Sequence, residues 1–260
     1  MSSSADKILG RLSVLVVDDH DINREFLHAG LSGVVGEVAA AEDGRAAVAL
    51  CQRRRFDVVL MDLHMPHMDG LIACQSIRQS ESPSQNATIL MLTADARPEE
   101  RARLLDQGVD GYLNKPITIP QLLAAILEQV APGVEAHALP QTRLEETRLI
   151  APEQALDAAN GDPALVARMS RLFAAELSEK LPELDAMIGS GEHARAAELL
   201  HQWRGACGFA GAARLHQVCG DLRQCLLQPN EPSAGSAYVE FLRTAQATGQ
   251  ALSVQETSPA

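Results

Sequence analysis

Aromatic residues and positive charge are both scarce in this sequence. Aromatic side chains make up 3% of the 260 residues, while hydrophobic residues as a whole make up 46%, so any core must be largely aliphatic. Lysine and arginine number 22 against 34 aspartates and glutamates, which gives a formal net charge of −12. Nucleic-acid binding needs a basic surface that contacts phosphates, so this balance argues against nucleic acid as a partner. The length is sufficient for two ordinary domains.

Cysteines are few, and long apolar runs are missing. The cysteines are Cys51, Cys74, Cys207, Cys219 and Cys225. Their odd number and scattered spacing fit reduced thiols, and the lack of a CxxC pair argues against a zinc site. The N-terminal segment lacks the apolar centre of a signal peptide, and no apolar run reaches about 18 residues, so we expect no membrane insertion. These features predict a soluble, cytoplasmic protein.

Four short apolar runs in the first half of the chain each end in a chemically useful polar residue. Run 13–17 ends in Asp18 and Asp19, run 58–61 in Asp62, run 88–92 in Thr93 and segment 111–114 in Lys115. Such runs predict buried strands, and the chemistry of parallel sheets collects at the carboxyl ends of the strands. Three carboxylates at one edge would repel one another unless a cation lies among them, and their oxygens suit Mg²⁺. The grouping predicts an aspartate that accepts a phosphoryl group with the help of a metal ion.

Helical segments alternate with these strands. We predict helices at 22–32, about 44–54, 69–80, 98–107 and 119–130, and a weak strand at 37–41. Strands and helices that alternate at this spacing imply right-handed crossovers and a parallel sheet.

The order and spacing of these residues resemble the receiver domain of two-component response regulators. The matching stretches are VLVVDD (14–19), NR (23–24), AEDGRAAV (41–48), VVLMDLHMPHMDG (58–70), LTA (92–94) and GYLNKPI (111–117). The resemblance covers about residues 12–131, and we place the domain at 10–131. It implies an α/β, flavodoxin-like fold with a doubly wound, five-stranded parallel sheet.

The resemblance also implies a role for individual residues. Asp62 would be the phosphoacceptor, Asp19 and Asp62 would bind Mg²⁺ directly, and Asp18 would bind it through water. The main-chain carbonyl of His64 would complete the protein ligands. Thr93 and Lys115 would contact the phosphoryl oxygens. Tyr112 would change its rotamer together with Thr93. The Lys115–Pro116 peptide bond would be cis.

The alternating pattern stops at residue 131. Pro132, Gly133 and Pro140 stand among polar residues, which predicts a linker over 132–151. Every strong signal after it is helical, with a short lead-in helix from 152 and longer helices at about 163–188, 192–210, 212–228 and 234–252. Pro182 falls inside the first long helix and predicts a kink or a break there. We predict an all-α four-helix bundle over 152–255.

The helix predicted at 192–210 carries a histidine in an unusual setting. His201 falls almost opposite the apolar stripe of this helix, so we expect it to face solvent, with Gly205 and Gly208 on the same face. Each glycine inside a helix costs roughly 1 kcal/mol relative to alanine. One reason to accept that cost is to leave the imidazole open to a partner. Arg204 is placed to reach an anion on the ring.

This segment, HQWRGACGFAGA (201–212), resembles the histidine phosphotransfer (HPt) domain. In that family the histidine is followed by a basic residue at the third position, glycine at the fourth and Gly-Ala at the tenth and eleventh, which here are Arg204, Gly205, Gly211 and Ala212. Arginine replaces the usual lysine, and Phe209 stands where a small polar residue is commoner. The resemblance covers about 152–228. It implies that His201 is a second phosphoacceptor, with Arg204, Gly205 and Gly208 at the docking surface.

These patterns predict a phosphorelay signalling protein that is not an enzyme, because no glycine-rich ATP-binding boxes are present. A sensor histidine kinase would phosphorylate Asp62, and His201 would carry phosphoryl groups to or from a receiver domain of another or the same protein. One alternative is a receiver switch whose bundle binds a partner without carrying phosphate. A second, a phosphatase of the haloacid-dehalogenase type, is weak because such enzymes have an aspartate where this chain has His64.

Overall fold

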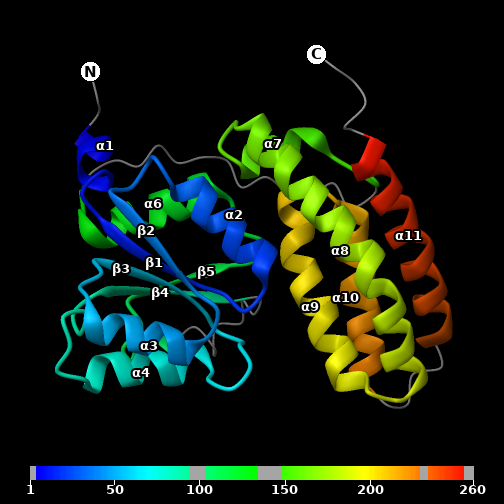
Figure 1. The fold of residues 1–260 in the computed structure, drawn as a ribbon, viewed down its shortest axis with the longest axis horizontal. Helices are drawn as coiled ribbons and strands as arrows, with labels where there is room; N and C mark the ends of the chain where they lie inside the picture. Colours follow the sequence, from blue (N-terminus) through cyan, green and yellow to red (C-terminus); the bar gives the residue numbers. More distant parts are fainter. Residues whose placement is uncertain (1–3, 94–102, 134–147, 229–233, 255–260) are drawn as a thin grey trace. The chain divides into compact units, whose positions relative to one another are not determined.

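The computed structural model describes residues 4–93, 103–133, 148–228 and 234–254. The chain divides into two units, Met1–Pro140 and Gln141–Ala260. The first unit combines a sheet with helices, and the described part of the second is helical (Figure 1). No helix in the described residues is both long enough and apolar enough to span a bilayer.

The sheet of the first unit has five parallel strands in the order β2-β1-β3-β4-β5. The strands are β1 (Ser13–Val17), β2 (Glu37–Ala41), β3 (Val58–Asp62), β4 (Thr88–Thr93) and β5 (Gly111–Asn114). All five lie within one residue of their predicted positions, which confirms the doubly wound α/β fold. The order reverses between β1 and β3, and ligands of open α/β sheets bind at such a switch point. Val17 at the end of β1 pairs with Met61 beside Asp62, so Asp18 and Asp62 leave the sheet as neighbours.

Helices cover both faces of this sheet (Figure 1). Helices α2 (Asp21–Leu31) and α6 (Ile119–Val130) lie on one face, and α3 (Gly44–Arg53) and α4 (Gly70–Gln79) lie on the other. The core beneath α3 and α4 is almost wholly aliphatic and includes Leu15, Val17, Val59, Met61, Ile89 and Met91. Because successive strand residues point to opposite faces, the apolar runs 14–17 of β1 and 58–61 of β3 are buried from both sides.

Side chains at the helix N-termini fix where α3, α4 and α6 begin. Asp43 accepts the backbone N–H of Ala46 at 2.7 Å, and Asp69 accepts that of Leu71 at 2.8 Å. Thr118 and Gln121 form a reciprocal capping box at the start of α6. The caps end the loops that follow β2, β3 and β5, which sets the positions of the loop residues near the carboxyl edge of the sheet.

Two segments of the first unit differ from the expectation or lie outside it. The helix α1 (Ser4–Leu9) was not predicted, because six residues with few apolar side chains carry no periodic signal. The first half of the helix predicted at 98–107 lies outside the described residues, and residues 103–106 are helical.

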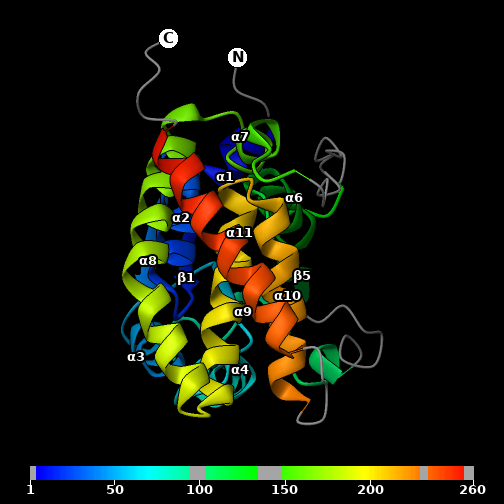
Figure 2. The same cartoon turned by 90° about the vertical axis from the view of Figure 1, so that its right-hand side faces the viewer.

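The second unit is the predicted four-helix bundle with a short lead-in helix (Figure 2). Its helices are α7 (Pro152–Ala158), α8 (Pro163–Gly189), α9 (His193–Phe209), α10 (Ala213–Leu227) and α11 (Ala234–Val254). Each long helix begins within one or two residues of the predicted position. The buried rings of Trp203 and Phe241 stack with their centroids 6.1 Å apart and join α9 to α11.

Helix α8 runs as one helix of 27 residues through Pro182, so the helix does not break there, and a kink at this proline stays a prediction. Proline removes one backbone N–H from the helix ladder, and packing along the rest of a long amphipathic helix outweighs that loss. Pro182 lines a cavity of about 820 Å³ between α8 and α11.

The turn between α9 and α10 depends on glycine. Helix α9 ends at Phe209, and Gly211 follows with φ +63. The N–H of Ala212 donates to the carbonyl of Cys207 at 2.9 Å, the long-range bond of a Schellman-type helix end. A Cβ at Gly211 would stand 2.4 Å from the carbonyl oxygen of Ala151, so this close approach also requires glycine.

Candidate functional site

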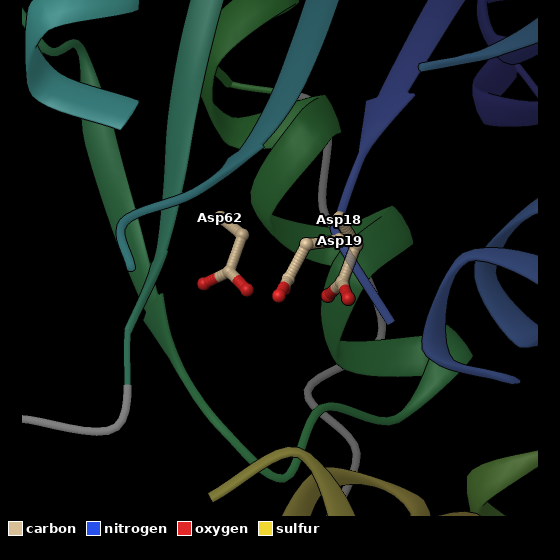
Figure 3. A group of neighbouring side chains, drawn as sticks. All are labelled: Asp18, Asp19 and Asp62. Atoms are coloured by element: carbon tan, nitrogen blue, oxygen red, sulfur yellow. The ribbon is translucent and has the colours of Figure 1, made fainter. Parts of the chain in front are cut away.

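Three aspartates meet at the switch point of the sheet (Figure 3). Asp18 and Asp19 follow β1 and Asp62 ends β3, and a carboxylate oxygen of each lies within 4.8 Å of the others. Asp18 and Asp62 are buried, whereas Asp19 is half-buried. The carboxylates therefore share one partly enclosed space at the carboxyl edge, as the sequence predicted.

Lys115 lies between two of these carboxylates. Its Nζ is 2.8 Å from Asp18 Oδ2 and 2.7 Å from Asp62 Oδ2, and only 12% of its side chain is exposed. Burial alone would lower the pKa of Lys115, but the neighbouring Asp18 and Asp62 carboxylates raise it above the ordinary value. Lys115 is therefore a fixed ammonium that contacts the carboxylate of Asp62.

The Asp62 carboxyl group is strongly perturbed. Burial raises its pKa to about 7; Lys115 opposes that rise, whereas Asp18 and Asp19 add to it. Three carboxylates face a single ammonium in this group, so negative charge is in excess. A hard divalent cation with oxygen ligands would correct that excess, and the donor set therefore fits Mg²⁺.

Neighbouring groups on β4 and β5 complete this edge. Thr93, the last residue of β4, is buried, and its carbonyl accepts the N–H of Lys115 at 2.7 Å. Tyr112 on β5 is half-buried and pairs with Met91 on β4. The Lys115–Pro116 bond is cis, as predicted. His64 is exposed, with Nδ1 4.0 Å from Asp69 Oδ2, and its role as a carbonyl ligand stays a prediction.

The histidine of the second unit lies on α9 within the bundle. His201 is half-buried, and its Nδ1 is a buried atom. Gly205 and Gly208 are buried. We predicted that this face of α9 points to solvent, but it is more buried than that prediction implied. Helix α9 packs against α7, α8 and α10, and its exposed residues, such as His193 and Arg195, lie near its N-terminus.

Arg204, one turn after His201, lies across the neighbouring helix. A Cβ built on Gly220 of α10 would be 3.4 Å from Arg204 Nε and 3.5 Å from its Cζ. Burial, with help from the charge of Arg204, lowers the pKa of His216 on α10 to about 4. Arg204 thus lies against α10 at Gly220.

Comparison with known proteins accounts for both units. Residues 14–127 match the family model of the response regulator receiver domain, and residues 168–251 match that of the Hpt domain. The chain joins a receiver domain to an Hpt domain.

Both domains recur together in longer relatives. The sensor histidine kinase AruS of Pseudomonas aeruginosa is 33% identical over 235 residues, which cover 89% of this chain and 23% of AruS. The sensor protein GacS of Pseudomonas syringae pv. syringae is 32% identical over 232 residues, 86% of this chain and 25% of GacS. The chain thus spans about a quarter of the length of these curated relatives.

Solved structures resemble the receiver domain. One is the receiver domain of sensor histidine kinase PA1611 from Pseudomonas aeruginosa, solved with a magnesium ion in its active-site cleft. It is 32% identical and covers 46% of this chain and 97% of its own, with a TM-score of 0.42.

The sequence did not reveal how Asp18 of the receiver domain is held. Asp18 Oδ1 accepts the backbone N–H of His20 at 3.0 Å and the side-chain amide of Asn23 at 3.3 Å. Arg24 donates to the Asp18 carbonyl at 2.8 Å and pairs with Asp21. Asn23 and Arg24 belong to the motif that suggested a receiver domain. Their position in the first turns of a helix that follows the acidic pair could have indicated that they contact Asp18.

Gly70 of the receiver domain lies where the start of α4 comes very close to the end of β3. A Cβ at this position would lie 2.1 Å from the carbonyl oxygen of Asp62. The start of α4 therefore presses against the backbone of the phosphoacceptor candidate. Only the structure shows this contact, since the two residues are eight positions apart.

Proposed function

We propose that this chain is a two-step phosphorelay component, with Asp62 and His201 as phosphoacceptors. The observation that carries the proposal is the buried Asp62 carboxylate, held 2.7 Å from Lys115 and beside Asp18 at the switch point of a receiver domain. An Hpt domain follows in the same chain. A sensor histidine kinase is the proposed donor to Asp62, and a receiver domain of this or another protein is the proposed partner of His201.

At Asp62 the reaction is an in-line displacement on phosphorus. A carboxylate oxygen forms the new P–O bond as the P–N bond of the donor phosphohistidine breaks, and the bonding electron pair goes to the leaving ring nitrogen. The donor imidazole leaves neutral when its other nitrogen carries a proton. Lys115 offsets the charge of the transferring group, and the Thr93 hydroxyl donates a hydrogen bond to a phosphoryl oxygen.

Asp18, Asp19 and Asp62 are the proposed ligands of Mg²⁺, with the His64 carbonyl as a further ligand. The ion would supply charge neutralisation for the phosphoryl oxygens. The excess of three carboxylates over one ammonium is the feature of this chain that supports its binding. Asn23 and the His20 N–H keep Asp18 oriented toward that space.

At His201 the nucleophile is a neutral ring nitrogen. Because Nδ1 is buried, we assign the attack to Nε2, whose lone pair forms the P–N bond. The P–O bond to the donor aspartate breaks, and its electrons return to the carboxylate. Nδ1 keeps its proton, so the phosphorylated ring is cationic and can pass the group on.

Aspartyl phosphate would act on the receiver domain by shifting it between two conformations, with Thr93 and Tyr112 as the switch residues. We propose a cytoplasmic site of action and no catalytic activity beyond phosphoryl exchange. Docking at His201 is assigned to Arg204, Gly205 and Gly208. We place the domain boundaries at 10–131 and 152–255, with 132–151 as the linker.

Small-molecule phosphodonors test the proposal without a known kinase. With Mg²⁺ and acetyl phosphate, the full chain should gain one base-labile phosphoryl group, and the Asp62→Asn variant should gain none. With phosphoramidate it should gain an acid-labile group that the His201→Gln variant lacks. Full base-labile labelling of the Asp62→Asn variant, or labelling that does not depend on Mg²⁺, would contradict the assignment.

The same variants distinguish the phosphorelay from the alternative, in which the bundle only binds a partner. If the Hpt domain acts by docking alone, the His201→Gln variant should signal normally in cells while losing the acid-labile label. A relay instead requires that both be lost together.

A further inference from the structure

Helices α9 and α10 form an antiparallel hairpin whose register is fixed at two points. Arg204 lies over Gly220, and the buried thiols of Cys207 and Cys219 are close neighbours. In an antiparallel pair, three residues back from Arg204 correspond to three residues forward from Gly220. This register places Arg223 of α10 at the level of His201 of α9.

The facing stripes of the two helices agree with that register. Residues 201, 204 and 208 share one face of α9, and residues 216, 220 and 223 share one face of α10, since side chains three or four positions apart are neighbours on a helix. The α10 stripe is His216, Gly220 and Arg223. The Arg204 side chain lies against Gly220, the middle residue of this stripe, because glycine has no side chain to occupy that space.

Arg204 and Arg223 each stand out, among the described residues, by a buried donor atom. Each has a buried Nε without a hydrogen-bond acceptor among the described residues. In contrast, carboxylates pair with Arg24, Arg54, Arg55, Arg78, Arg148, Arg195 and Arg214. A buried donor left unsatisfied costs about 1–3 kcal/mol. Two such guanidinium groups on facing helices constitute a site suited to an anion.

The anion that this position suits is a phosphoryl group. Guanidinium groups bind phosphate through paired N–H donors, and a phosphoryl group on His201 would carry a charge of about −2. The neighbouring His216 is neutral near physiological pH, because burial and the proximity of Arg204 lower its pKa to about 4. It therefore contributes no charge of its own, and the positive charge at this site comes from the two arginines.

We propose that α10 forms the second wall of the phosphohistidine site, where Gly220 seats the Arg204 side chain and Arg223 supplies a second guanidinium to the phosphoryl group on His201. This inference rests on the proposed role of His201 as phosphoacceptor. It assigns a positioning role to Gly220 and a phosphoryl-binding role to Arg223.

The test uses the full chain in an Asp62→Asn background, so that only His201 takes up phosphate from phosphoramidate. Arg223→Gln should slow uptake about five- to tenfold and raise the phosphoryl pKa, followed by ³¹P NMR, by about half a unit or more, because a nearby cation is lost. Arg223→Lys should restore much of both. The matched control is Arg195→Gln, since Arg195 is an exposed arginine on α9, the helix that carries His201, and pairs with Glu192. It should change neither quantity.

A double-mutant cycle tests the seat at Gly220. Gly220→Leu should slow uptake as much as Arg204→Ala does, yet add nothing in a chain that already carries Arg204→Ala. If Gly220→Leu unfolds the bundle, as judged by circular dichroism, Gly220→Ala replaces it. Its Cβ still meets Arg204 at 3.4 Å and should give a smaller slowing that Arg204→Ala likewise abolishes.

The outcomes separate this inference from the function beneath it. If the Asp62→Asn chain itself gains no acid-labile phosphate, the assignment of His201 fails. If the Asp62→Asn chain gains that phosphate, but folded Arg223→Gln protein keeps the same uptake rate and phosphoryl pKa, the proposed role of Arg223 is contradicted. The assignment of His201 as phosphoacceptor is then unaffected. Additive effects of Gly220→Leu and Arg204→Ala would overturn the seating role alone.

Discussion

At the scale of single residues, Gly70 shows how tightly the surroundings of Asp62 are built. A methyl group there would stand 2.1 Å from the Asp62 carbonyl oxygen, so either β3 or α4 must shift. Overpacking of this kind costs about 1–3 kcal/mol. We expect Gly70→Ala to lower the free energy of unfolding by about that amount and to weaken Mg²⁺ binding, measured by thermal unfolding and titration calorimetry.

The control for Gly70 lies in a helix with room. Gly249 of α11 has nothing within 4 Å of its virtual Cβ, so Gly249→Ala should leave stability unchanged or raise it by up to about 1 kcal/mol. Equal stability and equal Mg²⁺ affinity of Gly70→Ala and unmodified protein would show that the loop before α4 yields without moving Asp62.

His216 makes the bundle sensitive to acid. Burial, with help from Arg204, lowers its pKa from 6.5 to about 4, so below pH 6.5 the unfolded chain binds a proton that the folded chain does not. Its contribution to stability is complete above that pH and falls as the pH drops, until the loss levels off below about 4. The loss is about 3 kcal/mol.

Comparison of two variants isolates this effect from the titration of carboxylates. Denaturant unfolding of the His216→Gln variant should show a shallower decline between pH 6.5 and 4 than the unmodified chain. The His193→Gln variant, altered at an exposed histidine of the same bundle, should decline as the unmodified chain does. Parallel pH curves for His216→Gln and unmodified protein would contradict the burial argument.

At the scale of elements, the turn between α9 and α10 fixes the hairpin that presents His201. Gly211 combines a left-handed backbone with a contact to Ala151 that leaves no room for a side chain. Gly211→Ala should therefore destabilise the bundle by about 2 kcal/mol or more, measured by chemical unfolding.

Gly191 offers a matched control for the turn, between α8 and α9. It has φ +80 but nothing within 4 Å of its virtual Cβ, so alanine there meets only backbone strain. Gly191→Ala should cost about 1 kcal/mol. If the two variants lose the same stability, the contact with Ala151 contributes nothing.

The sequence predicted elements well where their apolar pattern was long or flanked by clear breakers. The strands before Asp18, Asp62 and Thr93 were placed to within a residue because their apolar runs are unbroken. At Pro182 the sequence left a kink and a break both open, because local propensity does not include the packing that keeps α8 continuous. Likewise, the half-burial of His201 depends on three neighbouring helices that no periodicity within α9 can show.

The candidate site divides in the same way. Chemistry-bearing residues such as Asp62 and Lys115 were found because parallel strands bring their ends together by rule. Residues whose role depends on how neighbouring helices pack were not found. Gly220 and Arg223 belong to this group, because their value depends on the register of two helices.

At the scale of the whole molecule, each unit has its own core and its own site. We expect fragments 1–131 and 152–260 to fold separately and to keep Mg²⁺-dependent labelling and phosphoramidate labelling, respectively. Each should unfold cooperatively, with amide NMR signals that overlay on those of the full chain apart from residues near the cut. A fragment that is unfolded alone would show that one domain depends on the other.

The stacked pair of Trp203 and Phe241 gives the molecule a built-in optical reporter. Trp203 is the chain's single tryptophan, and it is fully buried in the Hpt bundle between α9 and α11. Light absorbed at the red edge of the indole band is therefore absorbed in the second unit alone, and the receiver domain is dark at that wavelength. Emission reports the melting of the bundle, two residues from the proposed phosphoacceptor His201, while far-ultraviolet dichroism reports both units. The difference between the two signals is the unfolding of the receiver domain, observed without any label.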